Sequence, residues 1–317
     1  MLKKKETTIG FNLTERRITM VECKVNEKLI EMLKSAHGEI PPGLIQKGEI
    51  ADFDSLLAFI SEIVDDIKPQ TKFASFNIPP GTYLIKKMKL PEGYIASNPE
   101  LIKWEMRHQL LAPVEDYSFS HYYADGSSYF IAAQKKTIEQ RIELLNGLGF
   151  VPVAADPASI ILNNVFSFIE DNPVDMANVA MLELSCPYST MAIIVDGVFY
   201  PGGCFVTDPG IFLSAFHDSQ SPSRLNNFCE DIKAHFEMAY SNLGFKLDEM
   251  FFDTLVFSGG SPSSQVAIQA ERLFNSSIYL AGNIKKKKKI KFKGKLHNLS
   301  FSELASAIGL ALRIPDE

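Results

Sequence analysis

The sequence has few of the residues from which metal centres and disulfide frameworks are built. It contains four cysteines and six histidines in 317 residues, with no Cys-x-x-Cys pair and no two histidines four residues apart. Such a scattered set argues against a cysteine-rich or zinc-bound scaffold and is typical of reduced thiols in a cytosolic protein. No nucleophile-elbow pattern is present, so a Ser-His-Asp hydrolase is not expected.

The sequence also lacks a long apolar run and an excess of positive charge. No stretch approaches the ~18 apolar residues of a membrane-spanning helix. The opening "MLKKKETTIGFN" has basic residues without the apolar segment of a signal peptide. A net charge of −6 argues against general nucleic-acid binding. We therefore expect a cytoplasmic protein, soluble by itself, that reaches a membrane only indirectly.

The patterns that are present alternate between strand and helix. Apolar and polar residues alternate in "TIGFNLTERRITMVECK", which predicts a hairpin turning at "TERR", with a third strand in "KLIEMLKSAHGEI". Residues 52–67 carry apolar side chains at helical spacing behind Asp52, which predicts a capped amphipathic helix. Strands are expected at "KFASFNIP" and "TYLIKKMKLP" and a hairpin at Asp125-Gly126. Further helices are expected at 98–111, 137–149, 157–170, 222–243 and 263–274.

The second half of the chain repeats the opening pattern. After the polar, proline-bearing segment "EDNPVDMAN", the stretch "VAMLELSCPYSTMAIIVDGVFYPGG" predicts another strand–turn–strand meander, and helices follow it. A meander followed by helices that occurs twice indicates a duplicated α/β protein with a cleft between its halves.

The segments resemble, in order, the five signature positions of the actin-like ATPases. The segments are "IGFNLTERRITM", "AADPASIILNNV", "LELSCPYSTMAIIVDG", "LVFSGGSP" and "LASAIGLAL". Within that superfamily the chain resembles the PilM family of type IV pilus assembly proteins over nearly its whole length, through "PPGLIQKGEIAD", "IKWEMRHQLLAPVEDYSFSHYY", "YFIAAQKKTIEQRIELLNGLGFVPVAADPASI" and "SAIGLALR". The cytoplasmic part of the type II secretion platform protein stays open as a second relative.

The resemblance implies an α/β, actin-like (ribonuclease H-like) duplicated two-lobe fold. The first lobe would span residues 1–172, with an inserted subdomain at about 70–150, and the second lobe 173–300. A hinge helix within 301–317 would return to the first lobe. Small residues in the two hinge segments would let their helices cross closely: Ala158, Ser159, Ala305, Ala307 and Gly309.

The resemblance also implies a degenerate phosphate site. Actin-like ATPases bind the phosphates with backbone N–H groups of two hairpin turns, each usually carrying a D-x-G pattern. Here Asn12 and Thr14 occupy the first turn, and Glu183 and Ser185 the second. Pro187, which follows, has no N–H to donate, and Tyr188 adds bulk. We therefore expect no catalytic residues, no bound metal and no hydrolysis.

Ser258-Gly259-Gly260 still match the adenosine motif, and two interpretations stay open. The glycines either let a nucleoside approach the backbone or serve only tight strand-to-helix packing. No cofactor is certain; ATP or ADP with Mg²⁺ would act as a conformational ligand. The alternative is an active ATPase or kinase that uses Glu183 with Asp208 or Asp156 as metal carboxylates.

By resemblance, the function is that of a bacterial cytoplasmic adaptor, a scaffold and not an enzyme, at the inner-membrane platform of a type IV pilus or related type II secretion system. Its partner would be the cytosolic N-terminal tail of a PilN-type single-span protein. Pilus motor components would be further partners, and nucleic acid would not be one. The tail would dock as an extended peptide between the insertion and the first lobe, where "KFASFNIP" and "TYLIKKMKLP" offer an edge. Trp104, Arg107 and His108 are the candidate contact residues.

The lysine-rich tract 285–295 has two interpretations. It either binds an anionic surface or forms a solvated loop, part of which is an edge strand at Ile290 and Phe292.

Overall fold

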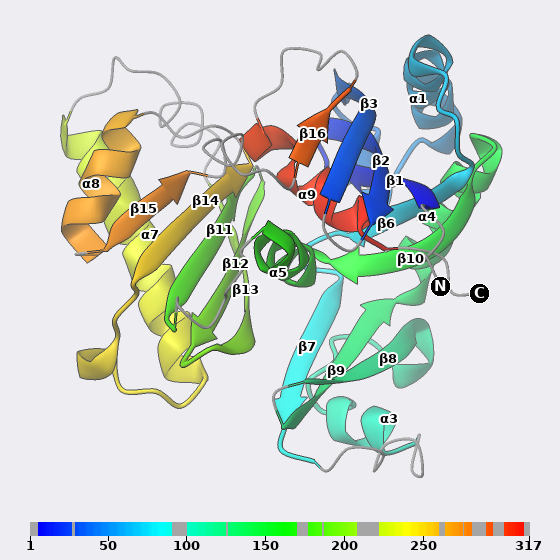
Figure 1. The fold of residues 1–317 in the computed structure, drawn as a ribbon. Helices are drawn as coiled ribbons and strands as arrows, with labels where there is room; N and C mark the ends of the chain where they lie inside the picture. Colours follow the sequence, from blue (N-terminus) through cyan, green and yellow to red (C-terminus); the bar gives the residue numbers. More distant parts are fainter. Residues whose placement is uncertain are drawn as a thin grey trace.

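The fold consists of two large sheets and a smaller third one (Figure 1). It is a computed structural model that describes residues 6–26, 29–90, 100–124, 126–169, 177–185, 187–207, 222–259, 264–274, 276–280, 290–293 and 301–313. The predicted boundary segment at 170–178 lies mostly outside this part of the chain. No helix of the described part is both long enough and apolar enough to cross a membrane.

The first sheet contains the predicted hairpin and third strand. Its order is β10-β6-β1-β2-β3-β16. β1 pairs antiparallel with β2 and parallel with β6. The strands are β1 (Glu6–Leu13), β2 (Arg17–Asn26), β3 (Leu29–Glu39), β6 (Phe73–Ile78), β10 (Val151–Pro157) and β16 (Ile290–Phe292). A short pair, β4 (Ile45–Gln46) and β5 (Glu49–Ile50), follows β3.

Helices α1 (Phe53–Ile67) and α4 (Lys135–Gly147) cover one face of this sheet. The predicted cap of α1 is confirmed, because Asp52 accepts a hydrogen bond from the backbone N–H of Ser55 at 3.1 Å. Leu56 and Ile60 of α1 are fully buried against the strands, as the helical spacing predicted.

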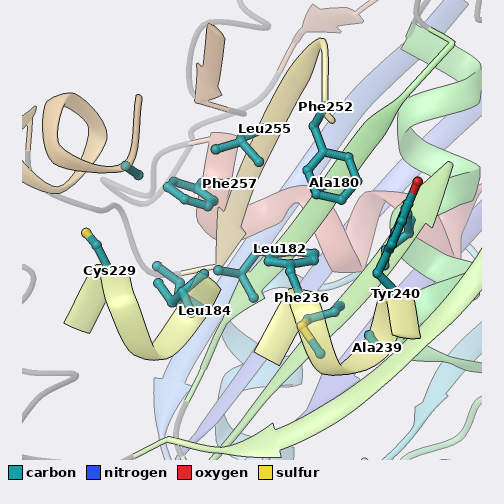
Figure 2. Close-up of a cluster of buried hydrophobic side chains, with 14 of the residues drawn as sticks. Ala180, Leu182, Leu184, Cys229, Phe236, Ala239, Tyr240, Phe252, Leu255 and Phe257 are labelled. Carbon is teal, nitrogen blue, oxygen red and sulfur yellow. The ribbon is translucent and has the colours of Figure 1, made fainter. Parts of the chain in front are cut away.

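The second sheet repeats the first. Its order is β13-β12-β11-β14-β15, which matches β3-β2-β1-β6-β10 strand for strand, so the predicted duplication is confirmed. The strands are β11 (Val179–Leu184), β12 (Tyr188–Val195), β13 (Val198–Val206), β14 (Thr254–Gly259) and β15 (Ser277–Leu280). Helices α7 (Pro222–Asn242) and α8 (Ser264–Phe274) cover its outer face, and the single turn η3 (Leu247–Glu249) follows α7. Figure 2 shows the core between this sheet and α7, where the rings of Phe236 and Phe252 lie with their centroids 5.8 Å apart.

Inside the range 70–150, a three-stranded sheet with the order β7-β9-β8 forms a unit of its own. It contains β7 (Tyr83–Met88), β8 (Tyr117–Ala124), β9 (Ser127–Gln134), helix α3 (Glu100–Met106) and the turn η1 (Val114–Asp116). The helix predicted at 98–111 is shorter, because Leu110 and Ala112 pack on the core of this subdomain while Leu111 between them is 96% exposed. That alternation does not fit a helix.

The subdomain contacts the second lobe through aromatic side chains. Tyr122 of β8 stacks on Tyr129 of β9 with ring centroids 4.6 Å apart, and the Tyr129 hydroxyl donates to the carbonyl of Phe199. The Lys87 ammonium lies 3.7 Å from the ring centroid of Tyr200. The three-stranded sheet therefore contacts β13 as well as the first lobe.

Helices α5 (Ala158–Ile169) and α9 (Phe301–Ala311) lie between the two large sheets (Figure 1). Their close crossing confirms the prediction from small residues: a Cβ on Gly309 would lie 2.7 Å from the carbonyl oxygen of Ile161. α9 also lies directly against β1, because a Cβ on Gly10 would lie 1.6 Å from the carbonyl oxygen of Ala307. The helix near the end of the sequence thus packs directly on the first strand.

Candidate functional site

A small cavity, partly open to solvent, lies where the two hairpin turns face each other. Its free volume is about 30 Å³, whereas pockets for small-molecule ligands usually enclose about 300–1,000 Å³. It brings together four of the predicted site residues, namely Asn12, Thr14, Glu183 and Ser185, and the two predicted obstacles, Pro187 and Tyr188.

Two backbone donors at the first turn are already used within the protein. The N–H of Leu13 donates to Asn77 Oδ1 at 2.8 Å, and Asn77 Nδ2 donates back to the Leu13 carbonyl at 3.1 Å. The N–H of Thr14 donates to the carbonyl of Arg17 at 2.9 Å. A phosphate group would have to displace these bonds, because the turn presents neither N–H group to the cavity.

The second turn is closed in the same way. The N–H of Ser185 donates to Ser189 Oγ at 3.3 Å, and the Ser189 hydroxyl lies 2.6 Å from that of Thr207. Pro187 has no N–H, and its carbonyl accepts from the backbone of Thr207 at 2.7 Å. Cys186 lies outside the described residues.

Glu183 is buried and hydrogen-bonded within the protein. Ser306 of α9 donates a hydrogen bond to Oε1 of its carboxyl. Burial raises the pKa of that carboxyl, and the bond from Ser306 opposes the shift only in part. The carboxyl thus already has a partner inside the molecule.

Of the other two carboxylates in the ATPase alternative, the one that the structure describes is Asp156, and it is engaged in an ion pair. Asp156 is held by Arg313 through two hydrogen bonds of 2.6 and 2.8 Å. Asp208 lies outside the described residues. Within the described chain no cluster of three metal-ligating side chains occurs.

Ser258 and Gly259 do not line the cavity. The pairing of their strand with β11 explains why a serine and a glycine occupy these positions. Gly259 pairs with Leu184 and has a φ of +85°, and a Cβ there would lie 2.1 Å from the Leu184 carbonyl oxygen. The buried Ser258 hydroxyl donates to the carbonyl of Leu182 at 3.3 Å. The packing interpretation thus has a direct structural basis. Gly260 lies outside the described residues.

The candidate partner-contact residues lie on the surface of the subdomain. Trp104, on α3, is 61% exposed, and Arg107 and His108 are exposed in the turn that follows. None of the three lines the cavity. Of the two strands expected to offer an edge, β6 does not, because it pairs with β1 and β10 inside the first sheet, whereas β7 is an edge strand.

Most of the lysine tract lies outside the described residues. Ile290–Phe292 form β16 at the edge of the first sheet, with Ile290 buried, so the predicted edge strand is confirmed. Lys293 pairs with Glu31 at 3.0 Å.

Sequence reasoning missed Asn77 and Arg141, which both line the cavity. Asn77 is the last residue but one of the buried strand β6, and its side chain is hydrogen-bonded to Leu13 at the neighbouring turn. Arg141 is 2% exposed and lies on the face of α4 that also buries Thr137, Leu144 and Leu145. A charged residue at an apolar-face position of an amphipathic helix is the signal that would have identified it.

Comparisons with known proteins show a fold match at low sequence identity. No family model and no curated protein sequence matches the chain. Among solved structures, a PilM–PilN type IV pilus biogenesis complex aligns with a TM-score of 0.73 and 16% identity over 98% of both chains. The ethanolamine utilization protein EutJ of Carboxydothermus hydrogenoformans aligns with a TM-score of 0.56 and 9% identity, over 98% of this chain and 91% of that one.

A third structure names the fold. A Bacteroides thetaiotaomicron protein described as having an actin-like ATPase fold and unknown function aligns with a TM-score of 0.52 and 10% identity, over 88% of this chain and 91% of that one. The duplicated sheet order and these matches agree with the prediction made from the five segments. The chain has the actin-like ATPase fold, and its structure is similar to that of PilM.

Proposed function

We propose that the protein is a non-catalytic adaptor of the inner-membrane platform of a type IV pilus or related type II secretion system. It binds the cytosolic N-terminal tail of a PilN-type, single-span membrane protein and links it to motor components. The protein itself stays in the cytoplasm and is held at the membrane by that partner. The full-length similarity to a PilM–PilN complex supports this choice of partner.

One observation carries the proposal: three N–H groups at the two turns that would bind phosphates are bonded within the protein. The N–H groups of Leu13, Thr14 and Ser185 are therefore not free to hold a phosphate in this conformation. Phosphoryl transfer depends on such a cradle and on charged carboxylates that hold Mg²⁺. Glu183, the candidate carboxylate of the second turn, is buried and bonded to Ser306, and burial raises its pKa, which disfavours the charged form that Mg²⁺ needs.

The shape of the molecule supports binding of an extended segment. β7 is an edge strand of the small sheet, and an extended peptide adds to such an edge through main-chain hydrogen bonds. The subdomain contacts both the first lobe and β13, so a bound tail would change the packing between lobes.

The test uses the single-span protein encoded beside this one. A fluorescent synthetic peptide of its N-terminal cytosolic residues is titrated with the purified full chain, and a scrambled peptide of the same composition is the control. We expect saturable binding of the native peptide alone. The absence of such a gene, together with no binding of any such peptide, would end the adaptor proposal. An ATPase rate that Glu183→Ala abolishes would replace it with the enzymatic alternative.

A further inference from the structure

The buried guanidinium of Arg141 has one satisfied edge and one unsatisfied edge. Nη1 donates to the carbonyl oxygens of Gly48 at 3.0 Å and Thr137 at 3.4 Å. Nε and Nη2 are buried without a hydrogen-bond partner in the described structure. Both atoms belong to the same edge of the planar group, and the side chain lines the cavity. Two parallel donors beside the cavity are thus buried without a hydrogen-bond partner among the residues that the structure describes.

The same edge of another arginine shows what it is suited to hold. Nε and Nη2 of Arg313 bind the two oxygens of Asp156 at 2.6 and 2.8 Å. Side-on pairing of this kind is a strong and geometrically specific mode of carboxylate recognition. At Arg141, no ion pair with a carboxylate occurs within the described residues.

The nearby carboxyls of this chain do not fill that role. Glu15 lines the cavity, but its Oε1 accepts from the backbone N–H of Gly48 at 3.2 Å. Glu183 is bonded to Ser306 and has a raised pKa. A buried cation without an oppositely charged partner costs folding free energy. Burial lowers the pKa of Arg141 to about 9. A ligand that supplies the missing charge would therefore stabilise the folded state.

We infer that Arg141 is a carboxylate-binding residue, which holds one acidic side chain of the docked partner segment through its Nε–Nη2 edge. This inference rests on the proposed function. The cavity favours a carboxylate over a phosphate because its walls are mostly apolar, its volume is small and the turn N–H groups are already bonded. A phosphate would leave oxygens without donors, whereas a carboxylate has two oxygens for the two N–H groups.

The first experiment follows the arginine Nε–H resonances of ¹⁵N-labelled protein by NMR. Sodium acetate, sodium phosphate and Mg-ATP are titrated separately at constant ionic strength and constant pH. We expect acetate to shift the Arg141 resonance saturably and to leave that of Arg313, which already holds Asp156, unchanged. Arg141→Lys assigns the resonance by removing it. A larger response to phosphate or Mg-ATP, or no response to any anion, overturns the inference.

The second experiment separates this inference from the proposed function. Two forms of the partner peptide are compared. One keeps its acidic residues, and in the other each Asp is replaced by Asn and each Glu by Gln. We expect the neutral peptide to bind the wild-type protein about tenfold more weakly than the acidic peptide does. We expect the two peptides to bind Arg141→Lys with equal affinity. Arg272→Lys, at an exposed position of α8, is the matched control and behaves as wild type.

The outcomes are distinct. If both peptides bind wild type equally, the role of Arg141 is wrong while the adaptor proposal stands. If acetate shifts Arg141 but no peptide binds, the carboxylate site stands and the adaptor proposal fails. Backbone-linked assignment of the wild-type protein also identifies the Arg141 Nε–H resonance, so the acetate titration stays possible even if Arg141→Lys does not fold.

Discussion

The hydroxyl of Ser306 donates a hydrogen bond to the buried carboxyl of Glu183. Glu183 is the last residue but one of β11 in the second sheet, and Ser306 belongs to α9, which covers the first sheet. The bond thus joins the two halves of the molecule.

Stability should depend on pH through Glu183. Because burial raises the folded-state pKa above the ordinary 4.5, the folded state keeps a proton that the unfolded chain releases as the pH rises through that value. The wild type therefore loses stability above pH 4.5. Glu183→Gln, which cannot ionise, should be more stable than wild type at about pH 8 and similar at about pH 4. Urea unfolding at both pH values measures this, and an equal difference at both would contradict it.

Calorimetric titration of Mg-ATP into the protein should give no heat of binding at sub-millimolar concentrations. The reason is that the N–H groups of Leu13, Thr14 and Ser185 at the two turns are bonded within the chain and the cavity is small. Asn77→Ala, which frees the N–H of Leu13, is the informative comparison, because it restores one donor. Tight binding by the wild type would show that the turns rearrange for the nucleotide.

Gly259→Ala should destabilise the protein in the absence of any nucleotide. Its Cβ would lie 2.1 Å from the Leu184 carbonyl oxygen, and its φ of +85° disfavours a side chain. We expect a loss of about 3 kcal/mol or more in the free energy of unfolding. Gly203→Ala is the control, because it has a φ of +89° with nothing within 4 Å and should cost only about 1 kcal/mol. Equal losses would mean that the contact with β11 is unimportant.

The surface of α3 gives a prediction about partner binding. Trp104→Ala should leave the melting temperature nearly unchanged, because the side chain is 61% exposed. If the partner tail contacts this face, the substitution weakens binding about tenfold or more, as buried aromatic anchors do. Arg107→Ala and His108→Ala test the rest of the face. Unchanged affinity in all three variants would exclude them as contacts.

The sequence predicted the fold well because its signals are local and repeated. The alternation in both meanders and the apolar spacing behind Asp52 each depend on neighbouring residues, and the structure confirms them. The site was less accessible, since its decisive contacts join residues far apart in the chain. Asn77 holds Leu13 across 64 residues, and Glu183 reaches Ser306 across 123. The end of α3 was wrong because tertiary packing at Leu110 and Ala112 overrides helical spacing.

The contact between β1 and α9 has a consequence for synthesis on the ribosome. Thr8 donates a hydrogen bond to the carbonyl of Ala311, and Gly10 lies against Ala307, so the earliest strand is covered by a helix made some 300 residues later. One apolar face of the first sheet therefore stays without its cover until residues 301–311 emerge. During that interval the nascent chain presents an apolar surface of the kind that chaperones recognise. A polypeptide truncated before this helix is expected to be prone to aggregation.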